Sequence, residues 1–144
     1  MSNLLHEQLQ KDCFVIGQFK LCILLLMNDK NYPWFILVPA RQQISEIYQL
    51  SPADRLLLIE ESSLLARLLD QHFKADKLNI AAIGNIVPQL HVHHVVRYRN
   101  DPAWPAPVWG KVAALPYRDE EANAMIQTIG TALCELTDFQ RPEK

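Results

Sequence analysis

Three of the five histidines of the chain lie within four consecutive positions, as His91, His93 and His94 in the segment LHVHHVVRY. Imidazoles grouped in this way can bind a metal ion, or they can act as nucleophiles and acid–base groups, because they titrate near neutral pH. The residues between and after them are mostly apolar and β-branched, which is typical of a strand. Which of these roles is possible therefore depends on which face of the strand each of the three side chains occupies.

Successive side chains of a strand point to opposite faces of a sheet. Gln89, His91 and His93 then share one face, and His94 lies on the other. For His94 the ordinary interpretation is a partly buried, hydrogen-bonded strand residue. We predict a strand over residues 90–98, with His91 and His93 facing an open pocket and His94 facing the opposite side.

A metal site has little support in the sequence. Zinc requires three or four converging nitrogen, sulfur or carboxylate ligands. His91 and His93 supply two, the cysteines have no metal-ligand spacing, and His6 and His72 would have to approach through the fold. The sequence therefore predicts no metal ligands, and a metal-binding protein remains as a minor alternative.

The segments around the histidines alternate between strand and helix patterns. Apolar runs predict about five strands, within FVIGQF, LCILLLM, WFILVPA, KLNIAAIGN and LHVHHVVRY. Ser51 as N-cap and Pro52 at the first helical position predict a long helix that continues to about His72. The segment DEEANAMIQTIGTALCEL predicts a C-terminal helix with acids at its positive end. Together these elements predict an α+β fold with a mostly antiparallel sheet, a long central helix and a C-terminal helix.

Size and composition fit one soluble domain. At 144 residues the chain is long enough for one core, and we expect a single domain over residues 1–144. A net charge of −2 gives no electrostatic reason to bind nucleic acid or an anionic membrane. No apolar run approaches the roughly 20 residues of a membrane helix. The N-terminus lacks a signal-peptide pattern and the three cysteines are widely spaced, so we expect a cytoplasmic protein with reduced thiols.

The segment GNIVPQLHVH resembles the active-site strand of the histidine triad (HIT) family of nucleotide hydrolases and transferases. The family pattern is His-φ-His-φ-His, with φ apolar, after a Gly-polar-x-φ turn. A triad that starts at His91 would put Val95 in the third place. A triad that starts at Gln89 replaces only the first histidine and aligns Gly84 and Asn85 with the turn. We prefer the second register.

The resemblance covers about residues 10–100. It includes the polar turn and strand in LLLMNDKNYPWFILVPA and the long helix from Ser51, and the tail PAWPAPVWG is similar to that of a bacterial subgroup of HIT-like proteins. It implies a homodimer that binds a purine nucleotide or nucleotide conjugate. No resident cofactor is implied, although a polyphosphate substrate could arrive with magnesium.

The resemblance also implies roles for the residues on the strand. In the family the central histidine, matched by His91, attacks an α-phosphate and forms a nucleotidyl-imidazole, while a main-chain carbonyl holds its other ring nitrogen. His93 resembles the member that touches the phosphate and can protonate a leaving oxygen. Gln89 departs from the family pattern, which has histidine at this position. An amide donates a hydrogen bond but exchanges no proton at neutral pH. A nucleotide hydrolase or transferase that uses His91 is the preferred function, and a nucleotide-binding module without turnover is the alternative.

Four further residues are implied as nucleotide-binding. Asn79 and Asn85 resemble the polar residues that line the phosphates, and Asn28 with Asp29 resembles the partner of the ribose hydroxyls. Each has an alternative as a turn-forming residue.

The segment after the histidines contains an arginine and two tryptophans whose roles the sequence leaves open. We interpret Arg97 as a solvated arginine at a strand end rather than as a phosphate ligand. Trp104 and Trp109 can either stack on a base or a partner subunit, or pack within their own subunit.

Overall fold

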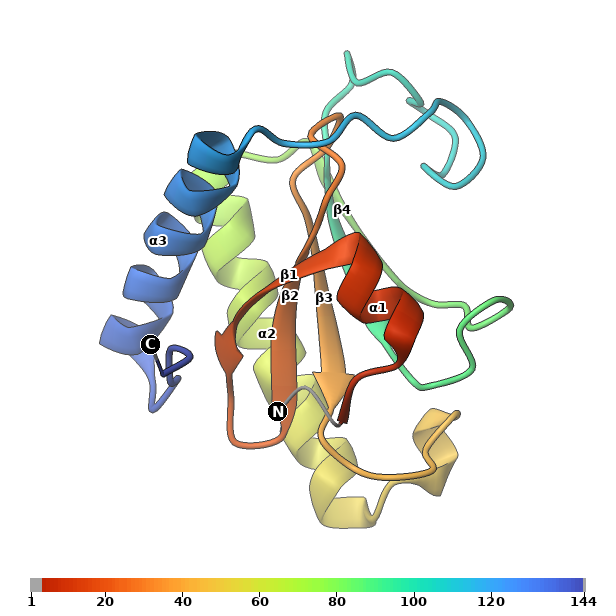
Figure 1. The fold of residues 1–144 in the computed structure, drawn as a ribbon, viewed down its shortest axis with the longest axis vertical. Helices are drawn as coiled ribbons and strands as arrows, with labels where there is room; N and C mark the ends of the chain where they lie inside the picture. The colour runs from red at the N-terminus through yellow and green to blue at the C-terminus, as the bar shows by residue number, and fades with distance from the viewer. Residues whose placement is uncertain (1–3, 144) are drawn as a thin grey trace.

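A five-stranded sheet forms the centre of the computed structural model, which describes residues 4–143 (Figure 1). The order of the strands is β1-β2-β3-β5-β4, and every neighbouring pair is antiparallel. The predicted α+β fold with a mostly antiparallel sheet is therefore confirmed. The bounds of the strands are Cys13–Gln18 (β1), Cys22–Met27 (β2), Trp34–Pro39 (β3), Lys77–Ala82 (β4) and Val92–Arg97 (β5).

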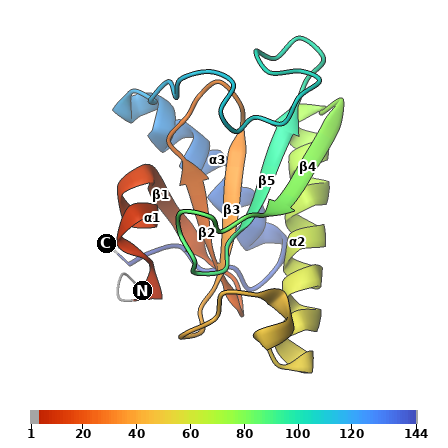
Figure 2. The same cartoon turned by 90° about the vertical axis from the view of Figure 1, so that its right-hand side faces the viewer.

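The helices are divided between the two faces of the sheet. The short α1 (Glu7–Asp12) lies on one face, and α2 (Pro52–Phe73) and α3 (Asp119–Leu136) cover the other (Figure 2). A 3-10 helix, η2 (Ile47–Gln49), precedes α2. In the part of the chain that the structure describes, no helix is long and apolar enough to cross a membrane.

The start of α2 follows the predicted capping pattern. The Ser51 hydroxyl accepts a hydrogen bond from the main-chain N–H of Asp54 at 3.1 Å, and Pro52 is the first helical residue. The helix ends at Phe73, and Lys74 follows in the left-handed conformation with φ 52°. The long central helix predicted from Ser51 to about His72 is thus confirmed to within a residue or two.

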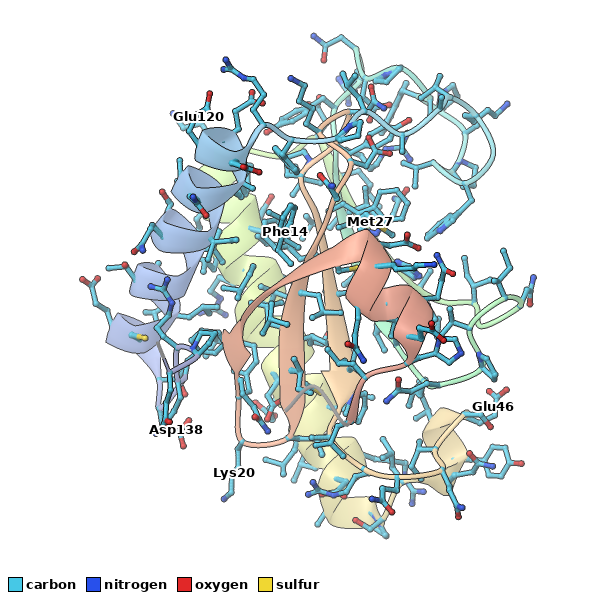
Figure 3. All side chains as sticks on the ribbon, in the orientation of Figure 1. Phe14, Lys20, Met27, Glu46, Glu120 and Asp138 are labelled. Atoms are coloured by element: carbon cyan, nitrogen blue, oxygen red, sulfur yellow. The ribbon has the colours of Figure 1, made fainter. Side chains whose placement is uncertain are left out.

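Apolar side chains fill both faces of the sheet, which explains why the third strand is apolar throughout. Phe35 and Leu37 of β3 belong to the core under α2 and α3, whereas Trp34 and Ile36 belong to the core on the α1 face. Figure 3 shows the same division farther along the sheet: Phe14 points toward α3, and Met27 lies beside α1. The face that carries α1 is also the face on which His93 lies.

Candidate active site

Strand β5 (Val92–Arg97) is shorter than the predicted strand over 90–98, so His91 lies just before it, but the three histidines divide between the two faces as predicted. In its pairing with β3, His93 lies opposite Ile36 and His94 lies opposite Phe35. Ile36 belongs to the core on the α1 face, and Phe35 belongs to the core under α2 and α3. The rings of His91 and His93 lie together, with centroids 4.9 Å apart. The α1 face therefore carries the pair, and the opposite face carries His94.

The pair does not face the open pocket that we predicted. His91 is 7% exposed and His93 is 4% exposed. The ring of Trp109 covers the site, with its centroid 5.0 Å from that of His93 and 5.7 Å from that of Trp34. The chain after β5 folds back over the α1 face, because Val108 and Trp109 pack into the apolar core there. Of the two interpretations of Trp109, the structure shows packing within the subunit.

His91 is held by the main chain two residues before it. Its Nδ1 lies 2.7 Å from the carbonyl oxygen of Gln89. A carbonyl only accepts hydrogen bonds, so Nδ1 carries the proton of the neutral ring and Nε2 keeps its lone pair. An imidazole in this form is ready to act as a nucleophile through Nε2.

His93 is held by a residue that the sequence analysis did not single out. The indole Nε1 of Trp34 donates a hydrogen bond to Nδ1 of His93 at 2.9 Å. Burial, and to a lesser extent the positive charges of His91 and His94, lower the pKa of His93 to about 3. His93 is therefore neutral at physiological pH. A buried indole N–H needs a partner, but only the register of β3 against β5 identifies that partner as His93.

His94 connects β5 to α2. Its Nε2 lies 2.7 Å from the hydroxyl of Ser62, and its Nδ1 lies 3.1 Å from the carbonyl oxygen of Val92. Burial lowers the pKa of His94 to about 4. This arrangement agrees with the expected buried, hydrogen-bonded strand residue.

The side chain of Gln89 is engaged with the N-terminal segment. Its Oε1 accepts a hydrogen bond from the main-chain N–H of His6 at 2.7 Å, and its Nε2 donates to the carbonyl oxygen of Leu4. Gln89 also lines a surface pocket together with His6 and Arg41. The side-chain amide thus links the N-terminal segment to the chain just before β5. The main-chain carbonyl of Gln89 separately orients His91.

Asn28 and Asp29 lie in the turn between β2 and β3, where they anchor the chain before α3. The Oδ1 of Asn28 accepts from the N–H of Tyr117 at 2.8 Å. The Oδ1 of Asp29 accepts from the N–H of Asn31 at 3.0 Å and from the N–H of Leu115 at 3.3 Å. Figure 2 shows the segment before α3 passing over this end of the sheet. These bonds fit the turn-forming alternative for both residues.

The two asparagines expected at the phosphates are in different settings. Asn79 lies on β4 opposite Val95, so it is on the same face as His93, and its Oδ1 accepts a hydrogen bond from Arg97 at 2.7 Å. Asn85 is exposed in the connection between β4 and β5. The structure therefore brings Asn79 to the correct face of the sheet but links it to an arginine.

Arg97 is buried, and the interpretation of it as a solvated arginine is wrong. Its side chain is 1% exposed and makes two hydrogen bonds to Asp101, at 2.8 and 3.0 Å. The guanidinium carbon also lies 5.7 Å from the ring centroid of Tyr32 and 5.6 Å from that of Trp104. The sequence alone does not reveal this burial, because the partners that satisfy the charge of Arg97 come from the loop after β5 and from β4.

Metal-ligating side chains do not converge in the described residues. No group of three or more histidine, cysteine, aspartate or glutamate residues within 4–143 is arranged to hold a metal ion. Both histidines of the pair also have their Nδ1 atoms occupied, by the Gln89 carbonyl and by Trp34.

One face of the antiparallel sheet carries His93 of β5 together with His91 just before the strand, and a main-chain carbonyl orients His91, as expected for a histidine triad protein. A scan against protein families matches the HIT domain over residues 8–100. The chain therefore belongs to the HIT family, whose members are typically nucleotide hydrolases or transferases. A comparison with curated proteins found no match.

Solved structures of three bacterial histidine triad proteins are similar over nearly the whole chain. The protein from Sinorhizobium meliloti 1021 is 45% identical over 90% of this chain and 96% of that one, with a TM-score of 0.87. The protein from Marinobacter aquaeolei VT8 is 48% identical over 90% and 96%, with a TM-score of 0.84. The protein from Bradyrhizobium japonicum is 43% identical over 87% and 93%, with a TM-score of 0.85.

Proposed function

We propose that the protein is a HIT-type nucleotide hydrolase or nucleotidyl transferase that cleaves a bond to a nucleotidyl α-phosphate through His91. The observation that carries this proposal is the 2.7 Å contact between Nδ1 of His91 and the Gln89 carbonyl, because it leaves Nε2 as the nucleophilic atom. The ring of His93, 4.9 Å away, supplies a second polar group for the same phosphate.

The proposed reaction has two displacements at phosphorus. The lone pair of His91 Nε2 forms a bond to the α-phosphorus, while the bond from phosphorus to the leaving group breaks and the leaving group keeps the electron pair. The His91 ring keeps its Nδ1 proton, which stays hydrogen-bonded to the Gln89 carbonyl, and the ring becomes cationic. A water oxygen, or another acceptor, then bonds to phosphorus and gives up its proton to solvent. The N–P bond returns its pair to Nε2, and hydrolysis yields a nucleoside monophosphate.

In this proposal the substrate is a purine nucleotide conjugate, such as a phosphoramidate or a dinucleoside polyphosphate. Gln89 takes the first triad position, Asn79 and Asn85 contact phosphate, and Asn28 and Asp29 contact ribose. The observed bonds of Asn79 and Asn28 use their side-chain oxygens, so their amide nitrogens remain for oxygens of a ligand. No resident cofactor is required, and a polyphosphate would bring its own magnesium. Since Trp109 covers His93, binding requires this ring to be displaced.

A nucleotide-binding module without turnover is the second candidate, and the environment of Gln89 favours it. The Gln89 amide is bonded to the main chain of residues 4 and 6 and carries no exchangeable acid proton at neutral pH.

The test is a screen of adenosine and guanosine phosphoramidates and dinucleoside polyphosphates with the full chain. For an enzyme, we expect a rapid burst of one leaving group per site, followed by steady turnover. Tight equilibrium binding with no product after prolonged incubation would contradict the enzyme and support the module.

We also propose that the protein is a cytoplasmic homodimer. The three cysteines are free, as in a reducing compartment. Strand β4 lies at the edge of the sheet, and its Ile80 is 49% exposed, with Ile83 and Ile86 at 42% and 87% just beyond. An open edge with apolar side chains is typical of an interface.

We expect sedimentation to give a dimer mass for the native chain and a monomer mass for Ile80→Asp. Leu136→Asp, on α3 and also exposed to solvent at 59%, is the matched control and should keep the native mass. A native chain that sediments as a monomer at micromolar concentration would contradict the proposal.

A further inference from the structure

Trp34, the first residue of β3, determines which nitrogen of His93 carries a proton. The indole Nε1 is a donor only. It lies 2.9 Å from His93 Nδ1, so this nitrogen must be the unprotonated one. The single proton of the neutral ring is therefore on Nε2.

A second proton on His93 is disfavoured by the same contact. Protonation of Nδ1 would place two N–H groups against each other, and the residue is only 4% exposed to water. Strand β3 and the segment after β5 present Trp34 and Trp109 to the ring, and neither is charged. The titratable groups that act on it are His91 and His94, whose positive charges also disfavour the cation.

The two histidines of the site consequently hold their protons on different nitrogens. His91 has its proton on Nδ1, against the Gln89 carbonyl, and a free lone pair on Nε2. His93 has its lone pair on Nδ1, against Trp34, and an N–H at Nε2. One ring is arranged to attack phosphorus, and the other is arranged to donate a hydrogen bond.

We infer that Trp34 is a positioning residue that fixes His93 as a neutral Nε2–H donor, so that the leaving group departs as an anion with a hydrogen bond instead of a proton. The inference rests on the proposed function and narrows its substrate class. As the bond from His91 Nε2 to phosphorus forms, the bond to the leaving oxygen breaks. That oxygen keeps the electron pair, and the proton stays on His93.

The inference therefore favours nucleotide substrates whose leaving group is stable as an anion, such as a phosphate, polyphosphate or carboxylate joined to the α-phosphate. An alkylamine leaving group requires a proton as it departs. A neutral imidazole cannot release its N–H at physiological pH, and the Gln89 amide cannot either. Anhydride-linked nucleotides are therefore the expected substrates, and alkyl phosphoramidates are expected to react slowly.

The position of the proton can be measured without any substrate. In the full chain labelled with ¹⁵N-histidine, two-bond ¹⁵N–¹H NMR spectra report which ring nitrogen is protonated. From about pH 5 to 8, the range in which histidine normally titrates, we expect His93 to keep Nδ1 bare and Nε2 protonated. Trp34→Phe keeps an aromatic ring but removes the N–H, so His93 should then populate both tautomers and titrate at higher pH.

Trp109→Phe is the matched control for this measurement. Its ring also packs on His93, at 5.0 Å, but His93 receives its hydrogen bond from Trp34. We expect Trp109→Phe to leave the tautomer of His93 unchanged. A native His93 with its proton on Nδ1, or a Trp34→Phe spectrum identical to the native one, would overturn the inference.

The kinetic consequence is tested with nucleotidyl substrates that differ only in the pKa of the leaving group. For the native chain, kcat/KM should fall by about 10²-fold or more between a leaving group of low pKa and one of high pKa, the factor that general acid catalysis usually supplies. Trp34→Phe should show a shallower dependence. An equal rate for both substrates in the native chain would overturn the inference. Failure of every substrate to react would contradict the proposed function alone, because the NMR spectra still decide the role of Trp34.

Discussion

We expect His91→Ala to lower kcat/KM by roughly 10⁴- to 10⁶-fold while the protein remains folded. The Nε2 atom of His91 is the nucleophile of the proposed reaction, and alanine offers no atom that could form the nucleotidyl intermediate. His93 cannot replace it, because its Nδ1 lone pair is bonded to Trp34 and its Nε2 carries a proton. The measurement is kcat/KM on a nucleotidyl substrate, with circular dichroism and Tm to verify the fold.

His94→Ala is the control for this experiment. His94 lies on the opposite face of β5, where it bonds to Ser62 and to the Val92 carbonyl. Its loss should leave most of the activity and lower the free energy of unfolding by about 1–3 kcal/mol. If His94→Ala eliminated turnover in a folded protein and His91→Ala did not, the alignment of the triad would be wrong.

Local periodicity was sufficient to predict the framework of the site. The two-residue repeat of a strand was enough to assign His93 to one face and His94 to the other before any partner strand was known, and His91, just before β5, lies on the side of His93. The start of α2 was equally predictable, because Ser51 and Pro52 act on their own helix terminus. Features of this kind depend on neighbours within a few residues.

The environment of the site depended on contacts that are distant in the sequence. Trp34 and His93 are 59 residues apart, and only the β3–β5 register brings the indole to the imidazole. The sequence also did not predict that Trp109 covers His93. A tryptophan is equally suited to stack on a ligand or to pack in a core, and its type alone does not distinguish the two. Arg97 shows the largest error, because a lone arginine in the sequence does not reveal that partners will allow its burial.

The buried ion pair of Arg97 and Asp101 leads to the largest expected change in stability. The two side chains are 1% and 4% exposed and are joined by a 2.8 Å contact. Removing one partner of a buried pair leaves the other charge without compensation. We therefore expect Asp101→Asn, which keeps the shape of the side chain, to lower the free energy of unfolding in urea by about 3–5 kcal/mol.

The exposed pair of Arg118 and Glu120 provides the matched control. Its side chains are 69% and 70% exposed, with a 3.3 Å contact. Water and salt screen such a pair, so Glu120→Gln should change the free energy of unfolding by no more than about 1 kcal/mol. Similar losses for Asp101→Asn and Glu120→Gln would show that burial does not govern the contribution of Arg97.

The effect of pH provides a second test of the same pair. Burial alone would raise the pKa of Asp101, but the hydrogen bonds from Arg97 and from the N–H groups of Tyr98, Ala103 and Trp104 outweigh it and hold the pKa below its ordinary value. A carboxylate whose pKa is lowered by folding stabilises the protein above its unfolded-state pKa, about 3.9, and this stabilisation is lost as the pH falls through the lower pKa of the folded state. The difference in free energy of unfolding between the native chain and Asp101→Asn should therefore be constant near neutral pH and shrink below about pH 4. A difference that stayed constant into strong acid would mean that the Asp101 charge does not supply the stabilisation, and that Arg97 is held instead by Asn79 and the aromatic rings.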